Sequence, residues 1–240
     1  GMPIDHIDRL GSVVVALGNN FATTESDIVR MGQRLAGAGA QIGLSEAQIM
    51  GFAAALSSVG IEAEAGGSAF SKVMIQMQLA VETGGNGLKD FAKVAGMSSK
   101  EFQTAFKDDA AGAINAFITG LGGMDEQGAS AIKVLDDMGI SEVRLRDALL
   151  RASGATEVFT GAQELANSAW EENTALTDEA GQRYATTESQ LVLLKNAANN
   201  LAIQFSEVMM PILRQWIDKL RGVIDWLSSL STSQKQMIVT

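Results

Sequence analysis

The chain has 240 residues, of which 46% are apolar, and this length and composition suffice for a globular protein with a sizeable core. It contains no Cys, which excludes a disulfide framework and a thiolate metal site. The formal net charge of −10 argues against a general nucleic-acid binder, because such proteins neutralise phosphates with Lys and Arg. Few aromatic residues and abundant glycine favour closely packed helices, so we predict an all-α fold.

Apolar residues recur three and four positions apart from the first predicted helix onward, which is the spacing of amphipathic helices. The first three predicted helices cover Ile7 to Leu17, Ile28 to Leu35 and Ile49 to Val59. Helix ends are predicted where glycine or asparagine follows an apolar row. These breaks fall at Gly18 with Asn19 and Asn20, at Gly39 to Gly43, at Gly60, at Gly84 to Gly87, at Gly120 to Gly123 and at Gly139. The pattern predicts about nine short helices followed by one long helix.

One helix-start pattern, in which glycine is followed by an apolar residue and serine, occurs three times. Its copies are Gly43-Leu44-Ser45, Gly96-Met97-Ser98 and Gly139-Ile140-Ser141. In this pattern glycine adopts the positive φ that ends one helix, and serine caps the next helix. At Ser98 the pattern is extended by Glu101, which can reach back to the cap. We therefore expect three similar corners, with a further turn at Gly60.

A polar stretch from Glu171 to Gln190 marks a boundary in the chain. We place the division near Thr186, which separates a compact helical region, 1–186, from a long amphipathic helix, 187–240. The charge changes there as well, because the residues from Lys195 onward include five basic and three acidic side chains, which leaves −12 on the first 194. The chain stops without a helix-stop signal, so we expect the long helix to be truncated at its C-terminal end.

The predicted long helix carries a row of apolar residues whose steps alternate between three and four, as a coiled-coil seam or a bundle face requires. Continuous from residue 187 to 230, it would be a rod of roughly 65 Å. Pro211 removes one helical hydrogen bond and should kink or split the helix near Met210. The row either folds back on the compact region or associates with other copies. The candidate self-association residues are Leu201, Phe205, Val208, Ile212, Trp216, Leu220, Val223 and Leu227.

No arrangement of residues indicates catalysis, and we assign no catalytic residue, cofactor or metal site. His6, the single histidine, lacks the partners that a metal site or a triad needs. The acidic pairs could supply carboxylates for glycoside hydrolysis, but adjacent helical residues point about 100° apart, and such pairs are usually solvated helix ends. These pairs are Asp108-Asp109, Asp136-Asp137 and Glu171-Glu172. The longest uncharged runs are also shorter than the roughly 20 residues that span a bilayer.

The stretch from Leu17 to Phe70 resembles the core domain of phage tail tape measure proteins, and the resemblance continues to the Met210-Pro211-Ile212 step. The other residues that carry it are Gly18, Asn19, Asn20, the Gly43-Leu44-Ser45 corner and the Gly60-Ile61 turn. That family threads the lumen of a long phage tail, sets the tail length during assembly and leaves when DNA is injected. The resemblance implies a structural function, in which this chain is one segment of a longer ruler.

The resemblance also implies partners. They are other copies of the chain in a bundle inside the tail lumen, the tail tube protein, tail assembly chaperones, and baseplate or distal tail proteins, with no sequence-specific nucleic acid. The expected location is the tail lumen of the virion, after assembly in the host cytoplasm. Two alternatives stay open. One is a tail-associated peptidoglycan hydrolase domain, and the other is an amphipathic helical protein that contacts a membrane only at infection.

Overall fold

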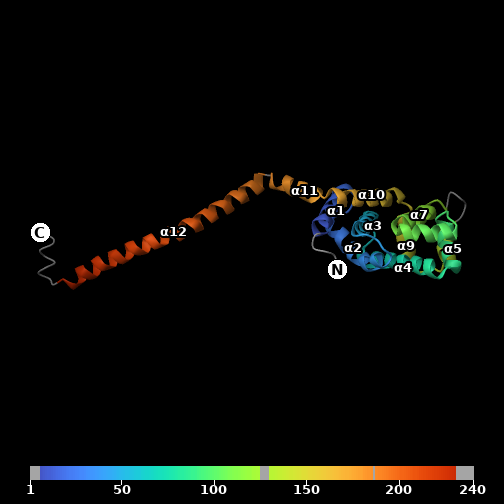
Figure 1. Cartoon of the computed structure of the whole chain (residues 1–240), viewed down its shortest axis with the longest axis horizontal. Helices are drawn as coiled ribbons and strands as arrows, with labels where there is room; N and C mark the ends of the chain where they lie inside the picture. The colour runs from blue at the N-terminus through green and yellow to red at the C-terminus, as the bar shows by residue number, and fades with distance from the viewer. Residues whose placement is uncertain (1–5, 125–129, 186, 231–240) are drawn as a thin grey trace. The chain divides into compact units, whose positions relative to one another are not determined.

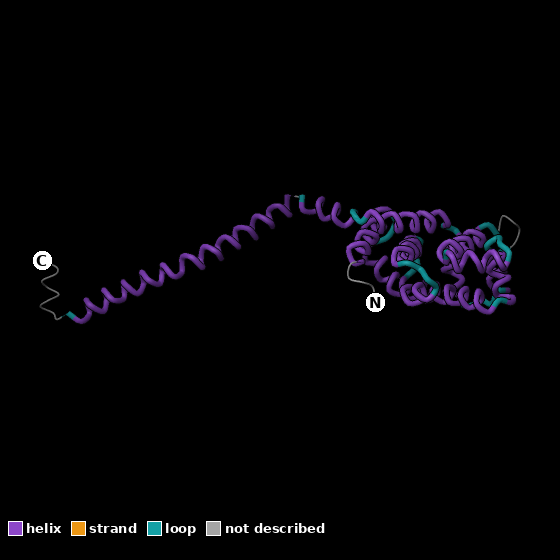
Figure 2. Tube along the Cα trace, viewed as in Figure 1, coloured by secondary structure: helices purple, strands orange, loops and turns teal. Residues whose placement is uncertain are grey.

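A computed structural model describes residues 6–124, 130–185 and 187–230 of the chain. Every regular element in these ranges is a helix, which confirms the predicted all-α fold (Figures 1 and 2). The helices are α1 (Ile7–Asn20), α2 (Glu25–Gln41), α3 (Glu46–Ser58), the π-helix η2 (Ala63–Gly67), α4 (Ser68–Thr83), α5 (Gly85–Val94), α6 (Ser99–Asp108), α7 (Ala110–Gly122), α8 (Ala131–Asp137), α9 (Val143–Ser153), α10 (Thr156–Glu172), α11 (Ala175–Tyr184) and α12 (Thr187–Ser229).

The chain divides into two units, residues 1–180 and residues 181–240. The predicted boundary at Thr186 falls six residues later, in a position outside the described residues. The first unit holds the buried core, and the second consists mainly of α12. Within the described ranges eleven α-helices and one π-helix precede α12, so the prediction of about nine short helices was too low.

Helices α1, α2, α3 and α10 form one end of the first unit. Helix α10 packs against α3 and α1 although more than 90 residues separate it from α3 in the chain (Figure 1). Phe52 of α3 lies between Phe70 of α4 and Phe159 of α10, with ring centroids 5.8 and 6.3 Å away, and all three are fully buried. The return of α10 therefore closes this part of the core.

Helices α5, α6, α7 and α9 form the other end of the unit, with α4 packed against both ends. Phe91 of α5 joins this part of the core by contacting Phe102 of α6 and Phe117 of α7, at centroid distances of 6.4 and 5.3 Å. Many of the remaining buried positions are alanine, as in the run Ala53, Ala54 and Ala55 of α3. Small side chains let the helices approach closely, which explains how a chain with so few aromatic residues fills its core.

The glycine corners have the geometry that their local sequence predicts. Gly43, Gly60, Gly96 and Gly139 all have positive φ, between 68° and 85°. At each corner the N–H of the following residue donates to the carbonyl five positions earlier, as from Leu44 to Gly39 at 2.9 Å. This is the Schellman arrangement, in which glycine avoids the Cβ clash of the left-handed conformation.

Two predicted breaks were wrong. Helix α1 continues through Gly18 to Asn20, whose side-chain amide donates to the Ala16 carbonyl at 2.8 Å. Gly18 instead leaves room for α2, because a Cβ there would lie 2.8 Å from Cγ of Glu25. Helix α12 likewise runs through Pro211 without interruption. Proline has a helical φ and removes only one backbone donor, so a long helix can absorb it where no neighbour crowds the ring.

Candidate assembly surface

The outer surface of α12 carries many exposed apolar side chains. Leu201 is 67% exposed, Trp216 is 64% exposed and Leu220 is 58% exposed, and Ile212 and Val223 are exposed as well. These are five of the eight residues that the sequence predicts for self-association. The side chains of Phe205, Val208 and Leu227 lie outside the described residues, although the helical spacing places their positions on the same row.

A second apolar row on α12 escaped the sequence analysis. Ile203, Met210, Ile217 and Ile224 are each seven positions apart, and all four are exposed. Seven-residue spacing keeps side chains on nearly one side of a helix, so the row extends the apolar surface sideways. The signal was present in the sequence as a heptad repeat beside the three-and-four row. We call the two rows together the α12 stripe.

The α12 stripe is a strong driving force for association. Fully burying one Leu, Ile, Val or aromatic side chain contributes roughly 1.5–3 kcal/mol, and the stripe offers nine described side chains of this kind or of methionine. Monomeric soluble proteins rarely leave such a contiguous apolar surface open to water. Charged residues lie on the remaining side of the helix, at Arg214, Asp218, Arg221 and Asp225. The helix is therefore amphipathic along its second half, as a bundle helix is.

The serine caps differ from one corner to the next. Ser45 and Ser98 each accept a hydrogen bond from the backbone N–H three residues later, and Gln48 and Glu101 return one to the cap N–H. The Gln48 half of the box at Ser45 was missed because only glutamate was considered. Ser141 does not cap a helix: α9 begins at Val143, with Glu142 at the cap position and no side-chain cap bond.

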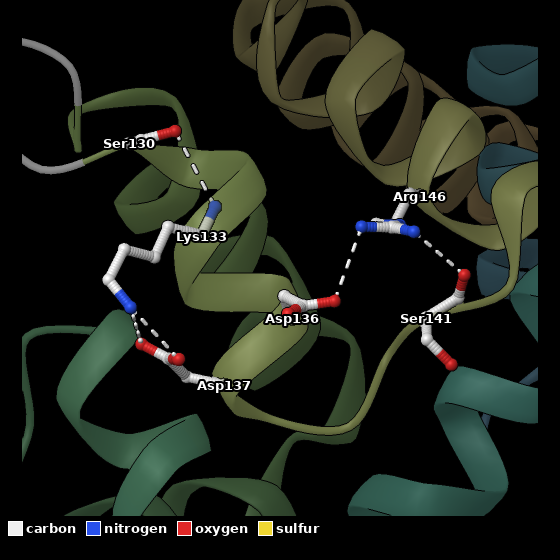
Figure 3. A network of polar contacts seen from close by, with 6 residues as sticks. All are labelled: Ser130, Lys133, Asp136, Asp137, Ser141 and Arg146. Carbon is white, nitrogen blue, oxygen red and sulfur yellow. Dashed lines mark hydrogen bonds and ion pairs between the residues drawn. The ribbon is translucent and has the colours of Figure 1, made fainter.

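Side chains near Ser141 form a separate polar network (Figure 3). The Ser141 carbonyl accepts a hydrogen bond from Nη2 of Arg146 at 2.9 Å, and Nη1 of the same guanidinium lies 3.4 Å from Asp136. Asp137 pairs instead with Nζ of Lys133, 3.1 Å from both carboxylate oxygens. The two adjacent carboxylates therefore have different partners and do not converge on a common point.

The other residues considered for chemistry also have structural partners. Asp109 caps α7 by accepting from Gly112 N–H at 3.1 Å, and Glu172 accepts from the Ser168 hydroxyl at 2.8 Å. His6 lies edge-on to Trp170, with ring centroids 5.2 Å apart, and its Nδ1 is 3.7 Å from a carboxylate oxygen of Glu46. Across the described ranges no group of three or more His, Asp or Glu side chains is placed to hold a metal ion.

An open polar groove of about 840 Å³ lies between α2 and the Gly60 turn. Arg34 reaches across it to Glu64, with 3.8 Å between Nη2 and Oε1, and Arg30 pairs with Asp27 on α2. A hydrogen bond from the Thr24 hydroxyl and then one from Arg30 hold the pKa of Asp27 below its ordinary value. Both guanidinium groups thus have carboxylate partners. Separately, none of the described helices is both long enough and apolar enough to cross a membrane.

The fold and the α12 stripe together define an all-helical protein built around an assembly surface. A family model described as phage-related minor tail protein matches residues 1–139, which is more than half of the chain. The chain therefore belongs to the phage-related minor tail protein family and is a component of a phage tail. No curated protein and no solved structure matches it. The matched region ends at Gly139, between α8 and α9, whereas the first unit continues through α10.

Proposed function

We propose that this chain is a segment of a tape measure protein, which occupies the tail lumen, sets the tail length and leaves when DNA is ejected. The observation that carries this proposal is α12, a 43-residue helix whose apolar stripe is exposed along its length. A continuous helix converts residue number into length at about 1.5 Å per residue, which is the property that a ruler needs. Membership in a phage tail family supports the same reading.

In this proposal the α12 stripe is covered by other copies of α12, so that the chains form a bundle in the lumen. The stripe supports this because its three-and-four spacing is the spacing at which helices pack side by side. During assembly in the host cytoplasm, tail assembly chaperones cover the chain before the tail tube protein polymerises around it. Baseplate or distal tail proteins hold one end. No sequence-specific contact with nucleic acid is involved.

Molar mass measured by light scattering tests the bundle. We expect the full chain to have a mass that is a multiple of 25.3 kDa. Leu201→Glu places a charge in the stripe and should return the chain to a single-chain mass, because burying an unpaired carboxylate costs several kcal/mol. Asn200→Glu is the matched control, because residue 200 is exposed and lies about 100° away around the helix. A wild-type chain that stays at 25.3 kDa at high concentration would show that the stripe is not a self-association seam.

Tail length tests the ruler directly. Duplicating residues 191–211 in a phage that encodes this chain adds 21 residues, which are three heptads and therefore keep the spacing of the stripe. The tail should lengthen by about 32 Å in electron micrographs, and a second duplication should double the increase. Unchanged tails that still carry the protein would contradict the length-setting function and leave membership in the family untouched.

A further inference from the structure

Helix α11 packs only shallowly on the first unit. It has no buried residue, and its main apolar side chain, Leu176, is 39% exposed. Leu176 lies over Gly11 of α1, where a Cβ would be 2.8 Å from Cδ2 of the leucine. Glycine at position 11 thus creates the shallow seat on which α11 rests. So small a buried surface makes this one of the more easily opened parts of the unit.

The joint between α10 and α11 depends on one strained residue and one buried hydroxyl. Asn173 has φ 52° and ψ 37°, and it is the one non-glycine residue of the described ranges with positive φ. The Ser12 hydroxyl donates to Oδ1 of Asn173 at 3.0 Å and accepts from Leu176 N–H at 3.4 Å. Ser12 is only 1% exposed, so both partners are needed to satisfy its hydroxyl.

Helix α1 supplies further contacts along the same path. Arg9 donates to the Trp170 carbonyl at 2.5 Å, and the Asn19 amide lies 3.5 Å from a carboxylate oxygen of Glu179. Residue numbers rise together on the two sides, so α1 runs alongside this stretch in the same direction. Each of these bonds joins residues about 160 positions apart. The position of α11 is therefore decided by α1 and by little else.

The apolar side of α11 has the same periodicity as the α12 stripe. Leu176, Ala180 and Tyr184 follow one another at steps of four, and Leu191 and Leu194 lie seven and ten positions after Tyr184. These steps are the same multiples of helical turns that place residues on one side of a helix. The row that faces α1 through Leu176 is thus the row that would lengthen the stripe if α11 were free.

We propose that α11 has two alternative partners: it is docked on α1 in the single chain, and it leaves α1 to lengthen the α12 stripe when chains associate. The inference rests on the self-association in the proposed function. Docking removes Leu176 and its neighbours from the seam, so α1 restrains assembly. By linkage, whatever holds α11 on α1 weakens association, and association in turn weakens the docking.

A disulfide lock tests the switch. Because the chain has no Cys, Gly11→Cys with Leu176→Cys introduces the only pair. A Cβ at position 11 would lie 3.8 Å from Cγ of Leu176, close to where the sulfur of Cys at 176 would be, so a disulfide needs only a small adjustment. The oxidised and reduced forms of the same protein are then compared by sedimentation, with Leu176→Cys alone as the control for the lost leucine.

The oxidised form should associate between about 5-fold and 150-fold more weakly than the reduced form, which is the usual range of coupling between two sites. Equal association of the two forms would overturn the switch and leave the bundle intact. If neither these forms nor the wild-type chain associates, both the bundle and the switch are wrong. Ser12→Ala provides an independent variant: it removes the two hydroxyl contacts and should associate more tightly than wild type, and association that is unchanged or weaker would contradict the proposal.

Discussion

Replacing Gly120 with alanine should destabilise the first unit, although helix propensity predicts the opposite. Gly120 lies inside α7, where alanine is favoured over glycine by about 1 kcal/mol. A Cβ at this position, however, would lie 1.8 Å from the carbonyl oxygen of Val94 and 2.8 Å from its carbonyl carbon. Real Cβ contacts stay above 3.0 Å, so α7 and the end of α5 must separate by roughly 1.2 Å, the difference between 3.0 and 1.8 Å.

The size of the effect follows from which atoms collide. The obstructing atoms belong to the backbone of Val94 and cannot rotate away as a side chain can. Overpacking of a core costs typically 1–3 kcal/mol, and we take about 3 kcal/mol because helix axes have to move. After the favourable propensity of about 1 kcal/mol is subtracted, the net loss is about 2 kcal/mol. For a unit of this size that lowers the melting temperature by about 4–8 °C.

Guanidinium unfolding followed by far-UV circular dichroism measures this difference as a lower midpoint at unchanged slope. Gly37→Ala is the matched control, because Gly37 lies inside α2 and a Cβ there would meet no atom within 4 Å. That variant should be more stable than wild type by about 0.5–1 kcal/mol. If Gly120→Ala were as stable as Gly37→Ala, the close contact between α7 and the end of α5 would be refuted.

Three further effects can be measured on the same chain. Ser45→Ala should cost about 1 kcal/mol in a thermal melt, and Ser141→Ala should be nearly neutral, because only Ser45 caps a helix; equal losses would contradict this difference. Phe159→Ala should cost about 3–5 kcal/mol in denaturant unfolding, since it empties the contact between α10 and Phe52; a loss under about 1 kcal/mol would mean that α10 does not close the core. The Ser98 N–H and then the Ser98 hydroxyl hold the pKa of Glu101 below its ordinary value of 4.5, so its contribution is present above that pH and is lost as pH falls through the lowered pKa. Between about pH 6 and pH 3 the melting temperature of wild type should therefore fall further than that of Glu101→Gln, and parallel curves would argue against this bond.

Much of the local structure follows from the sequence alone. The corners at Gly43, Gly60, Gly96 and Gly139 are readable because a left-handed residue and its Schellman bonds involve neighbours within five positions. The caps at Ser45 and Ser98 are local in the same way. The periodicity of α12 is also local, since it depends only on residue spacing along one helix. The all-α fold and the α12 stripe could therefore be predicted without coordinates.

Tertiary structure decided the features for which a single residue type has two uses. Glycine at positions 18 and 120 has the same identity as glycine at a corner, but both lie inside helices and make room for an approaching segment. Ser141 matches the capping pattern, yet its helix begins later and its carbonyl is bonded to Arg146. Local sequence does not distinguish a turn from a close approach, because the approaching atoms come from elsewhere in the chain.

The return of α10 and the position of α11 are the clearest cases. Phe159 completes a core that begins with Phe52, and Ser12 holds Asn173, which is 161 positions later. No periodicity connects such residues, because only the folded chain brings α1, α3 and α10 together. The sequence by itself therefore determined the helices, their corners and the α12 stripe. The tertiary structure decided which helices share a core and which helix α11 rests on, because these depend on contacts between segments far apart in the chain.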